Sequence, residues 1–184
     1  MNKIIDKKTN IILDESAILR AKEFASNVVG TCNYADSNQN SSGKIMNDYY
    51  TSKMGEEAVC MVFKIYGAEC SSPDYNIYVG SDKSWSPNLN VNGLGVAVKT
   101  QRRSSAQRYG LSWMFQVSPV HRDHILDEPD AWVVFVEYDD VNGSNEFIVF
   151  PPMQIKDIKF GDPKLDYLKG KQKVVYASDV GICR

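Results

Sequence analysis

The sequence predicts one α/β domain in which a central, mixed β-sheet is flanked by helices. Two segments carry apolar residues at helical spacing, and short runs rich in β-branched and aromatic residues follow them. With 184 residues, of which 43% are hydrophobic, the chain is long enough to bury one substantial core. We therefore expect a single domain with an N-terminal helix and loop at 1–47, a core at 48–150 and a C-terminal extension at 151–184.

The composition indicates a soluble, intracellular protein. No apolar run approaches the roughly 18 residues of a membrane span, and the polar start lacks the apolar core of a signal peptide. We expect a cytoplasmic protein with no membrane partner. The cysteines show no C-x-x-C spacing, so neither a zinc site nor a disulfide framework is indicated and reduced thiols are expected; they are Cys32, Cys60, Cys70 and Cys183. A net charge of −2 still leaves room for a local basic stripe that binds nucleic acid.

Two helices are expected in the first third of the chain. The first runs over 14–29, with Asp14 as its N-cap and Gly30 as its stop. A polar loop over 33–44 follows. The second helix runs from about Asp48 to Tyr66, and its apolar stripe is Met54, Ala58, Met61, Val62 and Ile65. Glu56 and Glu57 lie on its first half, outside the centre of the stripe.

Two strands are expected next, over 74–79 directly after Pro73 and over 91–101. Because side chains alternate along a strand, Ala97, Lys99 and Gln101 share one face of the second strand. A lysine is rarely buried without a partner, so Lys99 indicates a place where an anion or a carboxylate comes to meet it.

The remaining elements follow the same patterns. Residues 102–109 predict a short helix with three arginines, ended by Gly110, and strands are expected over 111–117, 131–138 and 146–150. The continuous apolar run at 131–138 is typical of a central strand covered on both faces. Segments 151–155 and 169–176 are expected to be peripheral elements, and the sequence does not indicate whether they are helices or strands. His121 and His124 have no cysteine or third histidine nearby, so a polar loop is expected there rather than zinc.

The order of these residues resembles the PD-(D/E)xK nuclease superfamily. Its αβββαβ core carries an acidic residue on the first helix, a Pro-Asp, and a strand ending in (Asp/Glu)-x-Lys. Here the matching residues are Glu56, Pro73-Asp74 and Lys99, within residues 48–138. The resemblance implies a restriction-endonuclease-like fold. Ala97 stands where the family usually carries a carboxylate, which implies that Glu56 or Glu57 takes that place and that Gln101 assists.

This resemblance implies a Mg²⁺-dependent DNA endonuclease in which Mn²⁺ substitutes and no organic cofactor takes part. Its implied metal ligands are Asp74 with Glu56 or Glu57, and its catalytic residues are Glu56, Asp74, Lys99 and Gln101. Lys99 would hold or help to deprotonate the attacking water, or steady the phosphate. The basic residues expected to contact DNA are Arg102, Arg103, Arg108 and Lys83.

Several roles remain open at this level. We expect a site-specific enzyme of restriction or homing type acting on double-stranded DNA, with a homodimer or two successive nicks for a double-strand cut. A Holliday-junction resolvase or a single-strand nuclease is an alternative. Ala97 also allows a catalytically inactive, nuclease-fold DNA-binding protein, and the net charge of −2 favours an interaction domain with no nucleic-acid role.

Overall fold

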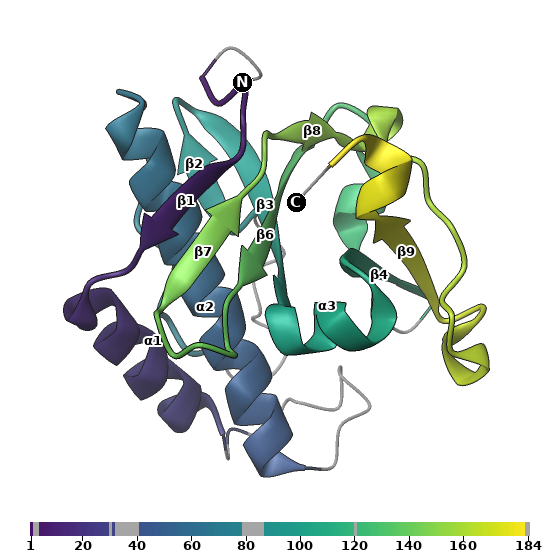
Figure 1. The fold of residues 1–184 in the computed structure, drawn as a ribbon, viewed down its shortest axis with the longest axis horizontal. Helices are drawn as coiled ribbons and strands as arrows, with labels where there is room; N and C mark the ends of the chain where they lie inside the picture. The colour runs from purple at the N-terminus through teal and green to yellow at the C-terminus, as the bar shows by residue number, and fades with distance from the viewer. Residues whose placement is uncertain (2–3, 30, 32–40, 79–86, 120, 183–184) are drawn as a thin grey trace.

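The computed structural model shows a mixed α/β fold built on a curled, mixed β-sheet (Figure 1). It describes residues 1, 4–29, 31, 41–78, 87–119 and 121–182, with His121 described by its backbone alone. The sheet has the order β1-β7-β6-β3-β2, with bounds Thr9–Ile12, Glu146–Val149, Trp132–Tyr138, Leu94–Arg102 and Leu89–Val91. The strands β3 and β6 are parallel, and the other pairs are antiparallel. A short strand β8, Met153–Gln154, also pairs with β6.

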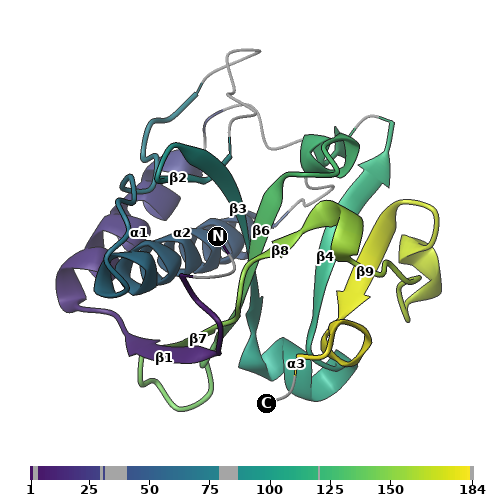
Figure 2. The same ribbon diagram turned by 90° about the horizontal axis from the view of Figure 1, so that it is seen from above.

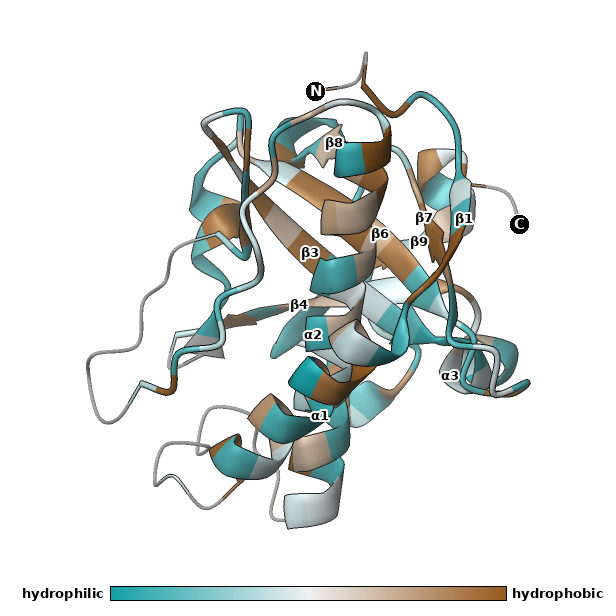
Figure 3. Cartoon of the chain, turned by 90° about the vertical axis from the view of Figure 1, so that its left-hand side faces the viewer, coloured by the Kyte–Doolittle hydropathy of each residue, from teal (hydrophilic) through white to brown (hydrophobic). Residues whose placement is uncertain are grey.

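Helices and a second sheet cover the two faces of this main sheet. Helices α1 (Glu15–Val28) and α2 (Ser42–Ile65) lie on one face, and the antiparallel sheet of β5 (His121–Arg122), β4 (Ser112–Ser118) and β9 (Gln172–Tyr176) lies on the other (Figure 2). Val134 and Val136 pack towards the helices, whereas Val133 and Phe135 pack towards Trp113 of β4. The prediction that 131–138 is covered on both faces is therefore confirmed, and Figure 3 shows the apolar colour along β3 and β6.

The predicted helices are present, with one changed boundary. Asp14 caps α1 by accepting a hydrogen bond from the backbone N–H of Ala17 at 2.8 Å. Helix α2 begins at Ser42 rather than near Asp48, because Ser41 caps it through a 3.4 Å bond from the N–H of Lys44. The predicted burial of Ile65 is wrong: it is 62% exposed, since it is the last residue of α2 and its neighbours on both sides are also exposed. The short helix α3, Arg103–Tyr109, ends at Gly110 as predicted.

The predicted strand over 74–79 is not formed at 74–78. Pro73 has no N–H to donate, and the Asp74 carboxylate accepts from the N–H of Asn76 at 2.9 Å, so a local turn replaces strand pairing. Pairing occurs earlier instead, where Cys70 bridges Val91 and the N–H of Ser71 donates to the carbonyl of Asn90 at 2.8 Å. In place of the strand predicted over 74–79, this segment therefore contributes a single β-bridge, which lies a few residues earlier, at Cys70.

The predicted strand over 91–101 is a hairpin. Strands β2 and β3 are joined by Asn92 and Gly93, whose φ angles are 50° and 82°. Positive φ at both turn residues matches a type I′ turn, the connection that Asn-Gly favours. The Asn-Gly pair between apolar residues was the signal for this turn. Beyond the turn, the predicted alternation holds, because Val96 and Val98 join the core beneath the helices and Ala97 joins the core beneath the second sheet.

Candidate active site

A cleft of about 1130 Å³ lies along the open edge of β3. Strand β2 pairs only with Leu94–Val96, so in the described part of the chain β3 has no strand partner on this edge from Ala97 onward. One wall comes from the first half of α2 and the other from β4 and the segment around Asp123. The polar residues in the lining are Asp48, Thr51, Ser52, Asn88, Lys99, Thr100, Gln101, Arg102, Ser105, Asp123, His124, Asp127, Glu128 and Asp130.

Asn88 connects β3 to α2 at this edge. Its side-chain Oδ1 accepts a hydrogen bond from the backbone N–H of Val98 at 2.8 Å, in place of a strand partner. Its Nδ2 donates to Oε1 of Glu56 at 3.1 Å. The amide therefore holds a carboxylate of α2 beside the strand that carries Lys99.

Glu56 is a buried carboxylate with several donors around it. The residue is 1% exposed, and Nζ of Lys53 lies 2.7 Å from its Oε2. The hydroxyl of Ser52 donates to Oε1 at 3.4 Å. Burial raises the pKa of Glu56, although Lys53, Ser52 and Asn88 oppose the shift. The Lys53 ammonium also lies over the rings of Phe24 and Tyr75, at 5.1 and 5.6 Å from their centroids.

The partner of Lys99 is the carboxylate of Asp123, and not Glu56 or Glu57, which were expected to take the carboxylate position of the motif. Nζ of Lys99 donates to Oδ2 of Asp123 at 2.7 Å and lies 4.6 Å from the centroid of the Phe115 ring. The same Oδ2 accepts from the backbone N–H of Gln116 at 2.9 Å, which holds the carboxylate in place. Both side chains are about one-quarter exposed, so this ion pair can be reached from the cleft.

Gln101 lies next along the same face of β3 and has a structural partner. Its Oε1 accepts from the N–H of Ser112 at 2.7 Å, and its Nε2 donates to the carbonyl of Gly110 at 3.3 Å. The side chain thus ties β3 to the first residue of β4. Its amide is occupied by the backbone rather than directed at the Lys99 ammonium.

The other two carboxylates predicted as metal ligands have their own partners. Glu57 accepts from both Nε and Nη2 of Arg20, at 3.0 and 2.9 Å, and from the Tyr75 hydroxyl at 2.8 Å. Asp74 is exposed; although partial burial raises its pKa, hydrogen bonds from Tyr78 and Asn76 lower it overall. Across the described ranges, no three His, Cys, Asp or Glu side chains form a metal-binding group.

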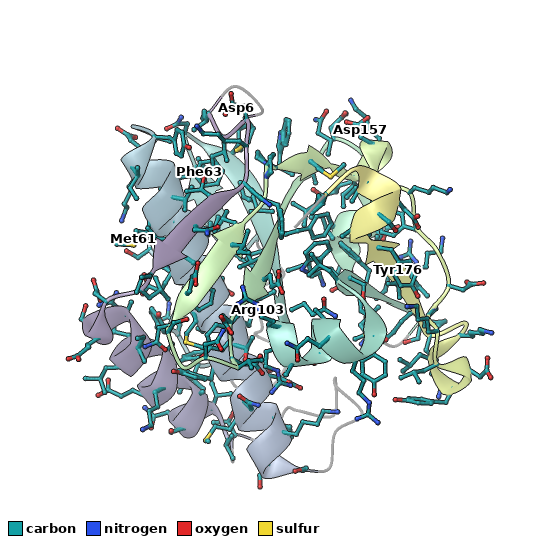
Figure 4. All side chains as sticks on the ribbon, viewed as in Figure 1. Asp6, Met61, Phe63, Arg103, Asp157 and Tyr176 are labelled. Atoms are coloured by element: carbon teal, nitrogen blue, oxygen red, sulfur yellow. The ribbon has the colours of Figure 1, made fainter. Side chains whose placement is uncertain are left out.

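The predicted DNA-contacting residues divide into different environments. Arg103, labelled in Figure 4, pairs with Glu137 at 3.4 Å and with Asp139, both of which are buried, so it belongs to an internal ion-pair cluster. Arg102 lines the cleft, 3.6 Å from Oδ1 of Asp48. Arg108 is exposed and lies 5.2 Å from the centroid of the Tyr109 ring. Lys83 lies outside the described residues.

Three residues of this site were missed by sequence reasoning: Lys53, Asn88 and Asp123. Pro87-Asn88 directly before an apolar strand is the same kind of signal as Pro73-Asp74, with an amide in place of the acid. Lys53 and Asp123 carry no such signal, because only the packing of α2 and the segment after β5 brings them to the site.

Comparisons with known proteins leave this geometry as the basis for inferring function. No family model, curated protein or solved structure matches the chain. Among the described residues, no helix is both long and apolar enough to cross a bilayer.

Proposed function

We propose that this chain is a metal-dependent DNA endonuclease whose active site is the cleft along β3. The observation that carries the proposal is that Asn88 links Glu56, on the helix side of the main sheet, to the edge of β3 next to Lys99, whose side chain faces β4. Asn88 binds Val98 and Glu56, and Lys99 follows Val98 directly. A lysine, a buried carboxylate and an amide beside a large cleft suit the hydrolysis of a phosphodiester.

The site offers Mg²⁺ one protein carboxylate, and water and substrate would supply the remaining oxygen ligands. This ion is usually bound through one or two carboxylates together with water and substrate phosphates, and amide oxygens are acceptable ligands. Glu56 would supply the carboxylate, and water and phosphate oxygens the other ligands, because Nδ2 of Asn88 faces Glu56 and its Oδ1 accepts from the N–H of Val98. Glu57 and Asp74 have other partners. Bound there, Mg²⁺ or Mn²⁺ would neutralise charge on the phosphate and activate water.

Lys99 acts on the phosphate in this proposal. Its ammonium already holds an oxygen anion, the Asp123 carboxylate, at hydrogen-bonding distance. A phosphate oxygen that enters the cleft takes the place of that carboxylate and accepts hydrogen bonds from Nζ. Asp123 keeps its bond from the Gln116 N–H during this exchange and so stays close enough to orient the lysine.

Arg102 and Arg108 are the remaining candidates for phosphate contacts. Arg102 lies in the cleft and Arg108 lies on the exposed side of α3, whereas Arg103 belongs to the internal cluster. We propose duplex DNA as the substrate and a site-specific cut of restriction or homing type. A double-strand cut by one centre per chain would use a homodimer or two successive nicks.

The decisive experiment incubates supercoiled plasmid, duplex, single-stranded and four-way-junction DNA with the protein and Mg²⁺. We expect metal-dependent cleavage that is lost in Lys99→Ala by at least ~10²-fold, as for removal of a positioned catalytic group. Lys169→Ala removes a lysine whose side chain is 52% exposed and paired at the surface with Asp166, and it is the matched control. Cleavage by Lys99→Ala at the control rate would refute the site.

Asn88→Asp tests whether the cleft holds a divalent ion. The change replaces the Nδ2 donor with an oxygen that faces Glu56, so two carboxylates repel one another without metal. We expect a lower melting temperature in EDTA and a larger rise on adding Mg²⁺ than the unchanged protein shows. Because the new carboxylate pair binds Mg²⁺ whether or not the native site does, the unchanged protein must itself show a rise on adding Mg²⁺. No rise in the unchanged protein would refute metal binding at Glu56.

A second function is favoured by the chemistry of one position. Ala97 places a methyl group where the resembled nucleases usually carry a carboxylate, which suits a DNA-binding protein without cleavage. That function requires DNA affinity that falls steeply with added salt while all substrates stay intact. Absence of salt-dependent binding would reject both DNA-directed functions.

A further inference from the structure

Cys60 and Cys70 lie together where α2 meets the edge of the main sheet. Both thiols are free, and their sulfur atoms approach the same carbonyl oxygen, that of Ser71, at 3.2 and 3.5 Å. The Cys60 sulfur also lies 3.7 Å from the carbonyl oxygen of Cys70. Cys60 is 2% exposed, whereas Cys70 is partly exposed. The pair therefore combines an inner thiol with one that a solute can reach.

The electrostatic surroundings distinguish the two thiols. The hydrogen bond with Cys70 lowers the pKa of Cys60 to about 7, and the Lys64 ammonium one turn later on α2 adds to this shift against the effect of burial. The same hydrogen bond and burial raise the pKa of Cys70. The lowered pKa favours the thiolate of Cys60 relative to that of Cys70, and the thiolate is the form that attacks a disulfide.

We propose that Cys60 and Cys70 form a reversible disulfide by exchange with a small disulfide such as oxidised glutathione. The accessible Cys70 loses its proton and attacks one sulfur of the small disulfide, forming a mixed disulfide and releasing one thiol. The Cys60 thiolate then attacks Sγ of Cys70 and releases the second thiol. The two cysteine sulfurs are oxidised, one small disulfide is reduced to two thiols, and the proton released by Cys70 and one from water end on those thiols.

The bond would join α2 to the segment that borders β2. Residues 69–71 pair with β2 through the bonds from Ser71 N–H to Asn90 and from Asn92 N–H to Glu69, at 2.8 and 2.9 Å. A short covalent loop between Cys60 and Cys70 restricts the unfolded chain, and we expect the melting temperature to rise by roughly 5–10 °C. The inference does not depend on nuclease activity.

The test uses the full chain with Cys32→Ser and Cys183→Ser, since both residues lie outside the described part of the structure. After treatment with oxidised glutathione, we expect a Cys60–Cys70 linked peptide in non-reducing peptide mapping, with the higher melting temperature. Dithiothreitol should reverse both changes. A stable glutathione adduct on Cys70, or unmodified thiols under conditions that oxidise free dithiothreitol, would overturn the proposal.

Two single variants in the same background supply controls. Cys60→Ala should stop at the glutathione adduct on Cys70, because no second thiol resolves it. Cys70→Ala changes a partly exposed residue and leaves the helix core intact, so it serves if Cys60→Ala fails to fold. It should show no rise in melting temperature on oxidation; a rise equal to that of the parent would refute the assigned pair.

Discussion

Among the residues that the structure describes, carboxylates are buried in two places, and their surroundings differ. Glu56 is held by a lysine, a hydroxyl and an amide beside the cleft. Glu137 and Asp139 are held by Arg103 at the end of β6, where Asp139 also accepts from the side chain of Asn142 at 2.7 Å. The guanidinium of Arg103 thus pairs with two carboxylates, whereas Glu56 accepts hydrogen bonds from three separate side chains.

This difference separates a structural cluster from a candidate site. A guanidinium is a rigid fork that favours fixed pairing with carboxylates, and removing it leaves two buried anions without their shared counter-charge. Lysine, serine and asparagine side chains are smaller, independent donors, which can exchange partners one at a time. The neighbours Arg102 and Arg103 therefore lie in different environments, although they were both predicted to contact DNA.

Arg103→Met should give the largest effect. Breaking a buried ion pair by removing one partner costs about 3–5 kcal/mol of unfolding free energy, because uncompensated buried charge remains. Arg102→Met is the matched control, since its 3.6 Å contact with the half-exposed Asp48 predicts a loss of about 0–1 kcal/mol. Urea unfolding of both variants measures the difference. Equal losses would contradict the contrast between these two arginines.

Gly55→Ala should give the next largest effect. A Cβ at this position would lie 1.9 Å from Oγ1 of Thr100, so α2 must move away from β3 or Thr100 must shift. Such overpacking costs about 1–3 kcal/mol, and the movement would also displace Glu56, the next residue. Gly43→Ala in the same helix meets nothing within 4 Å and should gain about 0.5–1 kcal/mol. Thermal unfolding of both variants measures these changes in unfolding free energy. Changes of the same sign in the two variants would contradict the close packing of α2 on β3.

The smallest expected effects are pH-dependent and have opposite signs at the two carboxylate sites. Because the folded pKa of Glu56 is raised, unfolding free energy should fall as pH rises from about 4.3, the usual glutamate pKa, towards the raised value. Although burial opposes it, hydrogen bonds from Asn142 and Val141 and the charge of Arg103 lower the pKa of Asp139. Its contribution is therefore present above the usual aspartate pKa and is lost as pH falls through the lowered value.

Unfolding measured across pH in Glu56→Gln and Asp139→Asn checks these signs. Glu56→Gln should remove the fall in stability above pH ~4.3, and Asp139→Asn should remove part of the loss in acid. A profile in which both variants flatten the same side would contradict the assignment of opposite pKa shifts.

Local patterns in the sequence predicted several elements well. The Asp14 cap, the apolar run of β6 and the alternation of Ala97 and Val98 on β3 each depend on neighbouring residues alone. The mixed sheet flanked by helices also followed from such patterns. The hairpin at Asn92-Gly93 carried an equally local signal that was not used.

The sequence by itself determined the helices α1 and α2, the buried strand β6 and that an anion or a carboxylate would meet Lys99, because caps, periodicity and face alternation act over a few residues. Only the tertiary structure decided which carboxylate that is, and that Arg103 pairs with residues 34 and 36 positions away. It also decided that Asn88, rather than Asp74, adjoins Glu56. These contacts depend on sheet register and on the packing of α2 against β3, which no short stretch of sequence specifies.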